Sequence, residues 1–206
     1  MTASSLAQEG RARFVVTMPP SPSRIETVLA STPAARLLAL TETADAFRHL
    51  ARKAQHRLVV MTPYIDRVGC AWVLDMFSST QARERVLILQ SAEQLTKYGV
   101  DEAALRAAAT QILIYGGGNT DETFHSKIVL ADGSDAYVGS ANFLSRSKMA
   151  NLECGLMVEG PVVSSVATLI EAIMATFDAT VAGCESAQST VLTNRSGEPE
   201  VQTTSK

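Results

Sequence analysis

Hydrophobic positions between residues 57 and 115 fall into short unbroken runs, which are separated by stretches with apolar residues at helical intervals. The runs are "RLVVMTPYI", "RVLILQ" and "QILIYGGG", and the stretches between them are "DRVGCAWVLDMFSS" and "SAEQLTKYGVDEAALRAAAT", the latter interrupted at Gly99. Strands that alternate with helices are typical of βαβ units. The runs lack polar alternation, which favours a sheet covered on both faces.

Three further strand-like runs follow residue 121 and lie close together along the chain. They are "HSKIVLA", "AYVGSAN" and "LECGLMVEG", and a helical pattern then covers residues 161–182 with Pro161 in its first turn. Another helical pattern covers residues 33–56 and breaks around Thr41 to Thr43, where a threonine can cap a second helix. We therefore expect an α/β fold, with a mixed β-sheet flanked by helices on both faces.

Changes of composition divide the chain into three parts. Residues 1–24 mix small polar residues with "MPPSPS", so we predict an extended lead-in with one edge strand at "ARFVV". Residues 25–182 carry the strand and helix patterns and form one domain. Residues 183–206 have little to bury, and we expect a disordered tail there.

The overall composition excludes several classes of protein. With 46% hydrophobic residues among 206, the chain can bury a core, and its formal net charge of −3 lacks the basic excess of proteins that coat nucleic acid. Cys70, Cys154 and Cys184 have no metal-binding spacing, so neither a disulfide framework nor a metal site is expected. The sequence shows no secretory signal and no apolar run near the roughly 18 residues of a membrane span, which predicts a cytoplasmic protein without membrane association.

Polar residues interrupt the otherwise apolar segment "HSKIVLADGSDAYVGSAN", residues 125–142. If Gly133 and Ser134 form a two-residue turn, Lys127 faces Ser140 and His125 faces Asn142. Residues two apart on a strand share a face, so these four side chains are predicted to gather at the open end of one hairpin.

The chemistry of this cluster suits a phosphate anion. Lys127 can neutralise charge, Ser140 and Asn142 can donate hydrogen bonds, and His125 can attack phosphorus or transfer a proton near neutral pH. Glu153, on the next strand, can hold an imidazole N–H and fix its tautomer.

The same residues carry a family resemblance. "HSKIVLAD" has the form H-x-K-x4-D and ends at Asp132, "GSAN" follows, and Glu153 lies eleven residues after Asn142. This closely resembles the signature of the phospholipase D superfamily, and the pattern from about 57 to 178 is similar to one half-unit of that two-motif fold.

The resemblance implies a phosphodiesterase that needs no metal and no cofactor. It implies that His125 forms a phosphohistidine, that Lys127 and Asn142 hold the phosphate with help from Ser140, and that Glu153 orients the histidine. Asp132 belongs to the same catalytic signature, although family members use it mainly to order the site.

The family site normally combines two motifs, and this sequence holds one. His49 and His56 do not begin another motif, so a homodimer is expected to bring two copies of His125 together across a two-fold axis. This arrangement resembles the small bacterial nucleases of the superfamily. A narrower resemblance, to the phospholipase D-like component of DISARM-type phage-defence systems, implies defence-system partner proteins.

Three functions follow from these observations. The first is a nuclease, with DNA as the expected substrate; the second is a lipid phosphodiesterase with the same site; the third is a non-hydrolytic subunit that binds nucleic acid within a complex. Arg146 and Lys148 follow the motif and either contact a polyanionic substrate or are solvated loop residues. Tyr64 and Trp72 are interpreted first as core or strand-end anchors and second as stacking residues for a base.

Two further features have both a structural and a functional interpretation. Glycines 116–118 are predicted to be a flexible lead into the active-site strand rather than a phosphate-binding loop, because no helix or lysine follows them as in a P-loop. The basic residues Arg48, Arg52, Lys53 and His56 recur on one helix and are predicted to form a solvated face rather than a phosphate-binding patch.

Overall fold

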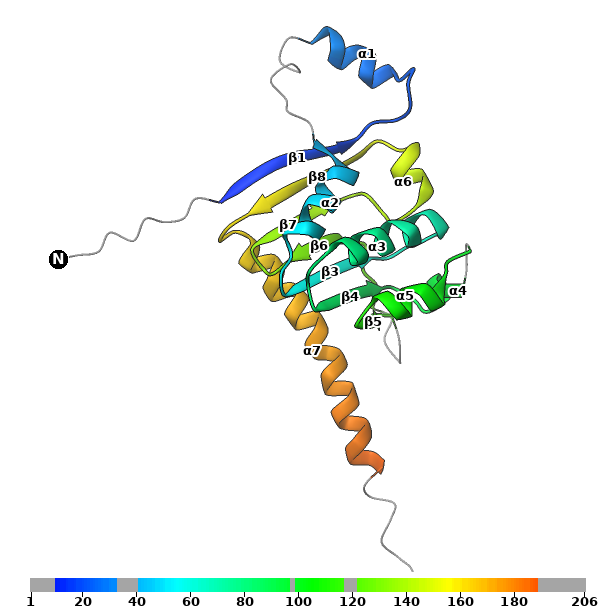
Figure 1. The fold of residues 1–206 in the computed structure, drawn as a ribbon, viewed down its shortest axis with the longest axis vertical. Helices are drawn as coiled ribbons and strands as arrows, with labels where there is room; N and C mark the ends of the chain where they lie inside the picture. Colours follow the sequence, from blue (N-terminus) through cyan, green and yellow to red (C-terminus); the bar gives the residue numbers. More distant parts are fainter. Residues whose placement is uncertain (1–9, 33–40, 97–98, 117–121, 189–206) are drawn as a thin grey trace, which may run out of the picture.

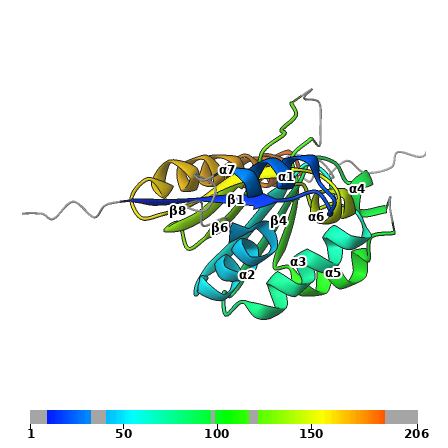
Figure 2. The ribbon, with the colours of Figure 1, turned by 90° about the horizontal axis from the view of Figure 1, so that it is seen from above.

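The computed structural model of the protein describes residues 10–32, 41–96, 99–116 and 122–188, with side chains described as far as residue 177. Its core has three layers, with one sheet between α7 on one face and α2, α3 and α5 on the other (Figures 1 and 2). The strands are β1 (Arg11–Thr17), β2 (Thr41–Glu42), β3 (Arg57–Thr62), β4 (Glu84–Leu89), β5 (Gln111–Ile114), β6 (Lys127–Ala131), β7 (Asp135–Gly139) and β8 (Glu153–Glu159).

The helices connect and cover these strands. They are α1 (Arg24–Ser31), α2 (Thr43–Lys53), α3 (Arg67–Ser79), α4 (Glu93–Thr96), α5 (Glu102–Ala108), α6 (Ser145–Met149) and α7 (Val163–Gln188). Gly99, at φ 68°, lies between α4 and α5, which agrees with the expected interruption of that helical pattern. Neither α1 nor α6 was predicted from the sequence.

The eight strands form one mixed sheet in the order β2-β1-β8-β7-β6-β3-β4-β5. β3, β4 and β5 are parallel, whereas β6, β7 and β8 follow as antiparallel neighbours. The predicted α/β class, with a mixed sheet covered on both faces, is confirmed. The chain reverses between β6 and β7 and again between β7 and β8, so the start of β6, the end of β7 and the start of β8 meet at one end of the sheet.

Two apolar clusters hold the layers together. On one face Phe47 of α2 packs against Trp72, Tyr137 and Phe143, with ring centroids 4.9–5.1 Å from its own. On the other face Val163, Ile170 and Ile173 of α7 cover β3, β4 and β6. Continuous apolar strands therefore have a burial partner on each side, as their sequence pattern indicated.

The β6–β7 hairpin has a different register from the expected one. Ala131 pairs with Asp135 and Lys127 with Gly139, one residue away from the predicted pairing. The connection is longer because Asp132 and Gly133 both have positive φ, 52° and 71°, as in a type I′ turn, and Ser134 N–H donates to the Ala131 carbonyl at 3.1 Å. The turn was therefore predicted at the right place, but its two-residue form with Gly133 as the first central residue was wrong.

Both ends of the chain contribute more regular structure than expected. In the expected lead-in, β1 pairs with β8 along all seven of its residues, and β2 adds a short parallel edge beyond it. α7 continues to Gln188, so residues 183–188 of the expected tail are helical, and Figure 1 shows this part of α7 extending past the sheet. Residues 189–206, and residues 33–40 of the expected first helix, lie outside the described residues.

Candidate active site

The residues of the H-x-K motif lie where β6 begins. His125 is exposed just before the strand, and Lys127, its first residue, is 2% exposed. These two residues and Ser140 line a shallow depression at the end of the sheet. The depression is completed by Phe14, Val138, Gly139, Cys154, Gly155 and Leu156.

Lys127 and His125 are in direct contact. Lys127 Nζ lies 2.8 Å from Nδ1 and 3.2 Å from Nε2 of the imidazole, and it donates to the His125 carbonyl at 2.5 Å. An ammonium group has no acceptor, so the ring nitrogen that bonds to it must present a lone pair. A neutral imidazole has one such lone pair, so this hydrogen bond must break before the ring can attack phosphorus.

Burial lowers the pKa of Lys127, and the negative charge of Glu153 opposes this shift. The net direction is downward, so the ammonium form is less favoured than on an exposed lysine. An additional anion beside Lys127, such as a phosphodiester, would stabilise its charged form.

Glu153 is 6% exposed, and its side chain makes hydrogen bonds with Ser140, directly after β7, and with Asn151, in the loop before β8. Its carboxylate accepts a bond from Ser140 Oγ at 2.5 Å and another from Asn151 Nδ2 at 3.2 Å. Ser140 Oγ in turn accepts the backbone N–H of Cys154 at 3.0 Å. Glu153 thus fixes Ser140 and acts on Lys127 through its charge, whereas the sequence predicted a bond to the imidazole.

Asn142 follows β7 at the same end of the sheet, in a loop held against β3. The next residue, Phe143, forms a parallel bridge with Ile65. The Oδ1 atom of Asn142 is buried and has no hydrogen-bond partner among the described residues. The carboxamide therefore has unused hydrogen-bonding capacity, which is unusual for a buried polar group and common at functional sites.

Two glycines make room for an aromatic ring beneath this loop. A Cβ at Gly139 would lie 2.3 Å from Tyr137 Oη, and a Cβ at Gly155 would lie 2.4 Å from Tyr137 Cε2. Tyr137 is fully buried, and its hydroxyl accepts the N–H of Ala141 at 3.4 Å. Burial is the largest of the effects that raise the pKa of Tyr137 to about 12, so the phenol stays protonated.

Asp66 positions the same loop and was not identified from the sequence. Its Oδ1 caps α3 by accepting the N–H of Gly69 at 2.9 Å, and its Oδ2 accepts both the N–H and the hydroxyl of Ser145, at 2.7 and 2.8 Å. Burial raises the pKa of Asp66, but these hydrogen bonds outweigh it and lower the pKa overall. An acidic residue directly before a helical pattern is an N-cap signal, and it could have indicated this role.

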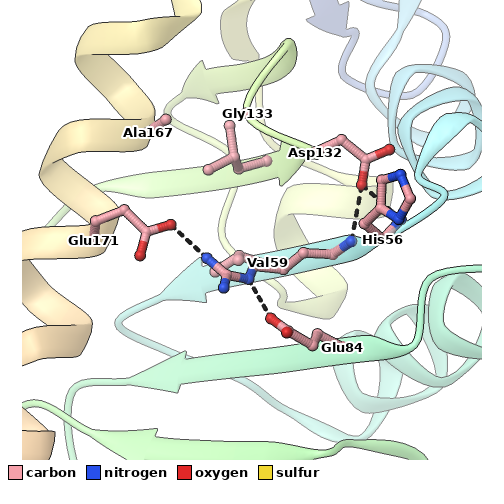
Figure 3. Close-up of a pocket in the computed structure, with 9 residues that line it drawn as sticks. His56, Val59, Glu84, Asp132, Gly133, Ala167 and Glu171 are labelled. Atoms are coloured by element: carbon pink, nitrogen blue, oxygen red, sulfur yellow. Dashed lines mark hydrogen bonds and ion pairs between the residues drawn. The ribbon is translucent and has the colours of Figure 1, made fainter.

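Asp132, expected in the catalytic set, lies at the opposite end of β6 from His125. Its carboxylate accepts three backbone N–H groups, from Gln55 at 2.7 Å and from His56 and Arg57 at 2.8 Å each. Asp132 lines a separate pocket together with Glu84 and Glu171 (Figure 3). These two glutamates both pair with Arg57. Since the whole strand separates Asp132 from the imidazole, we correct its assignment from a catalytic to a structural residue.

The remaining candidates lie in different environments. Arg146 and Lys148 are exposed on α6, and Lys148 Nζ lies 5.1 Å from the centre of the Trp72 ring. Trp72 itself is 5% exposed and belongs to the core, whereas Tyr64 is 43% exposed. Arg48 and Lys53 pair with Asp45 and Asp135, which agrees with a largely solvated helix face.

Part of the expected glycine-rich lead lies outside the described residues. Gly116 is described, and glycines 117 and 118 are not. In the described ranges no three His, Cys, Asp or Glu side chains come together as a metal-binding group. Within those ranges, too, no helix combines the length and the apolar character needed to cross a membrane.

The family of the chain follows from this fold and from a family comparison. The profile described as "Cardiolipin synthase, PLD-like domain" matches residues 47–179. The chain therefore belongs to the phospholipase D-like domain family. No curated protein matches it.

The solved structures that share this fold include Nuc and NucT. The phospholipase D family member Nuc from Salmonella typhimurium is 14% identical, with a TM-score of 0.50, and the match covers 82% of this chain and 95% of Nuc. NucT from Helicobacter pylori is 12% identical, with a TM-score of 0.52, over 82% of this chain and 97% of NucT. These comparisons give no support to the narrower resemblance to a phage-defence component.

Proposed function

We propose that the protein is a phosphodiesterase that cleaves nucleic acid through a phosphohistidine on His125. The observation that carries this proposal is the pairing of an exposed imidazole with a buried lysine ammonium, 2.8 Å apart, at the end of the sheet. The imidazole supplies a nucleophile, and the ammonium supplies the positive charge that an approaching phosphodiester requires. Membership of the phospholipase D-like family supports the same assignment.

The reaction has two steps that balance in atoms and electrons. In the first step the lone pair of the His125 ring forms a bond to phosphorus while the bond to the leaving oxygen breaks, and a second imidazolium protonates that oxygen. In the second step the neutral second imidazole takes a proton from water, the water oxygen bonds to phosphorus, and the N–P bond breaks. A phosphomonoester is released and both rings return to their first state.

Three groups of this chain bind the phosphate in these steps. Lys127 and Asn142 bond to the non-bridging oxygens, Lys127 through its charge and Asn142 by donating from its Nδ2 amide group. Ser140, held by Glu153, lines the same depression as Lys127. Neither Glu153 nor Asp132 contacts the reacting atoms in this assignment.

A second copy of the chain supplies the second imidazole. This follows from chemistry, because the described part of the chain brings one H-x-K pair to the site and the leaving oxygen needs a separate acid. A two-fold axis places His125 of the partner subunit opposite His125, since such an axis joins the same patch from both subunits.

An exposed apolar row beside the site supports this dimer. Phe14, Leu156 and Val138 lie directly opposite one another on β1, β8 and β7, and they are 45%, 46% and 39% exposed. All three line the depression that contains His125. Neighbouring exposed apolar side chains of this kind mark interaction surfaces, and this row is continuous with the half-site that needs completion.

The exposed cations Arg146 and Lys148 favour nucleic acid as the substrate. They lie on α6, directly after the loop that carries Asn142, where they can contact further phosphates of a polyanion. Most glycerophospholipids carry one phosphodiester, whereas a nucleic-acid strand presents a series of them to additional cations.

Trapping of the covalent intermediate tests the chemistry. Wild-type protein is incubated with labelled single-stranded DNA, duplex DNA, RNA or phospholipid vesicles, with a chelator present throughout. The reaction is stopped during turnover with a denaturant that contains no acid. We expect label on His125 from nucleic acid, and none in His125→Ala. If His125 is labelled from lipid alone, the same chemistry acts on a lipid substrate. DNA binding without any label or cleavage would identify a non-hydrolytic binding subunit.

The oligomeric state tests the shared site. Leu156→Glu places a charge in the apolar row, and Leu169→Glu places the same charge on α7, where Leu169 is 49% exposed. We expect Leu156→Glu to sediment as a folded, inactive monomer and Leu169→Glu to remain an active dimer. A fully active Leu156→Glu monomer would contradict the two-chain site.

A further inference from the structure

Tyr64 lies beside the proposed nucleophile with its side chain exposed. Its ring centroid is 6.2 Å from that of the His125 imidazole, with an interplanar angle of 69°, and 43% of the residue is exposed. By contrast, the aromatic residues Phe47, Trp72, Tyr137 and Phe143 pack together in the core, each no more than 5% exposed. An exposed aromatic ring next to reactive groups is available to a ligand.

The backbone of Tyr64 is anchored on both sides. The hydroxyl of Thr62, which is fully buried, donates to the Tyr64 carbonyl at 3.0 Å. Ile65 is fully buried and forms a bridge with Phe143, in the loop that also carries Asn142. The Tyr64 backbone is therefore fixed relative to the active-site loop, which keeps the side chain on the His125 side of the site.

We propose that Tyr64 stacks on an unpaired nucleobase next to the scissile phosphate and so selects single-stranded nucleic acid. This inference rests on the proposed nuclease function. The base of a nucleotide lies to the side of its phosphate, as the Tyr64 ring lies to the side of His125. A base inside a duplex is stacked on both faces and cannot offer one to Tyr64, whereas a base in a single strand can.

Stacking on an aromatic ring has a measurable size. Replacing a stacking aromatic residue by alanine weakens binding by roughly 5- to 150-fold per base. The contact does not depend on the hydroxyl, so Tyr64→Phe is expected to retain binding, whereas Tyr64→Leu, with an apolar but non-aromatic side chain, is expected to lose it. Exposed positions contribute little to folding, so none of these variants is expected to change the denaturation midpoint substantially.

Equilibrium binding tests the inference without depending on turnover. Tyr64→Ala, Tyr64→Leu and Tyr64→Phe are made in a His125→Asn background, which cannot form the phosphohistidine. Fluorescence anisotropy then measures binding of a labelled single-stranded oligonucleotide, of the same strand with one abasic residue placed at each position in turn, and of the duplex.

We expect a roughly 5- to 150-fold loss for Tyr64→Ala and Tyr64→Leu on the intact single strand. On the strand whose abasic residue occupies the stacking position, all variants should bind equally, because the base that the ring contacts is already missing. The duplex should bind weakly to every variant. Three outcomes would each overturn the inference. The first is an equal loss of affinity on the intact strand and on every abasic strand. The others are a loss of affinity in Tyr64→Phe and the absence of single-strand binding by the His125→Asn parent.

The outcome is separable from that of the proposed function. Phosphohistidine trapping in the wild-type background reports on the chemistry, and oligonucleotide binding in the His125→Asn background reports on Tyr64. A protein that forms the intermediate but binds base-containing and abasic strands equally retains the proposed chemistry and loses this role of Tyr64. A protein that binds through Tyr64 but never forms the intermediate retains this role of Tyr64 and loses the proposed chemistry.

Discussion

The Tyr137 ring occupies the space into which a side chain at Gly139 would have to project. A Cβ there would lie 2.3 Å from Tyr137 Oη and 2.7 Å from the carbonyl oxygen of Cys154, both far inside van der Waals contact. On the next strand, a Cβ at Gly155 would meet Tyr137 alone, with three ring and hydroxyl atoms at 2.4–2.7 Å. The glycine of the "GSAN" segment is therefore a packing requirement of the tyrosine beneath it.

Gly139→Ala and Gly155→Ala are expected to destabilise the protein by about 1–3 kcal/mol each, because overpacking forces the ring or the strand to move. Urea unfolding measures both. In a Tyr137→Leu background the penalty should fall at both positions, and it should fall more at Gly155, where the three nearest atoms all belong to the ring. Equal penalties with and without the ring would show that another contact is responsible.

Asp132→Asn tests the anchor of the β6–β7 turn. Asparagine tolerates the positive φ of this position, so the substitution removes charge with little change of shape. Burial raises the pKa of Asp132, but hydrogen bonds from the N–H groups of Arg57, Gln55 and His56 lower it overall. We expect a loss of about 1–3 kcal/mol at neutral pH, measured by chemical denaturation.

The pH dependence of that loss has a definite sign. A carboxylate whose folded pKa lies below its unfolded value stabilises the protein above the unfolded pKa, which is about 3.9, and this contribution disappears as the pH falls through the folded pKa. The difference between wild type and Asp132→Asn should therefore be constant above about pH 5 and shrink below about pH 4. Asp75→Asn, at an exposed position on α3, is the matched control and should show little difference at any pH.

Glu153→Gln should move the alkaline limit of activity to lower pH. Burial lowers the pKa of Lys127 and the charge of Glu153 raises it, so removing that charge lowers the pKa of Lys127 further. The ammonium that holds the phosphate is then lost at lower pH. The dependence of kcat/KM on pH measures the shift. An unchanged alkaline limit would mean that Lys127 is not the group that titrates there.

Two adjacent residues of α7 should differ sharply in their contribution to stability. Ile170 is fully buried against the sheet, so Ile170→Ala should cost about 2–5 kcal/mol. Glu171, with a side chain 58% exposed, pairs with Arg57, and Glu171→Ala should cost less than about 1 kcal/mol and less still in high salt. Thermal or urea unfolding distinguishes them, and similar costs would mean that the ion pair, not apolar packing, holds α7 on the sheet.

Much of this architecture was predictable because its signals are local. Unbroken apolar runs and helical intervals identified β3, β4, β5, α3 and α7, and the H-x-K-x4-D spacing with "GSAN" identified the family. Three of the four residues predicted to gather, His125, Lys127 and Ser140, line one depression, although the register behind that prediction was wrong by one residue and Asn142 does not line the depression. Composition alone, in contrast, led to the underestimate of β1, whose partner β8 lies about 140 residues later in the chain.

Only the tertiary structure decided the details on which the proposed chemistry depends. The hairpin register was set by two residues with positive φ and by three distant N–H groups on Asp132, which no hydrophobic period encodes. Likewise, Glu153 bonds to Ser140 rather than to His125. Asp66 bonds to Ser145, 79 residues away, and so holds the loop after β7. Both bonds form because packing of the strands brings these groups together. The sequence thus determined the order of elements and the chemical groups of the site through short-range patterns. Their partners and the exposed position of Tyr64 beside His125 depend on long-range packing.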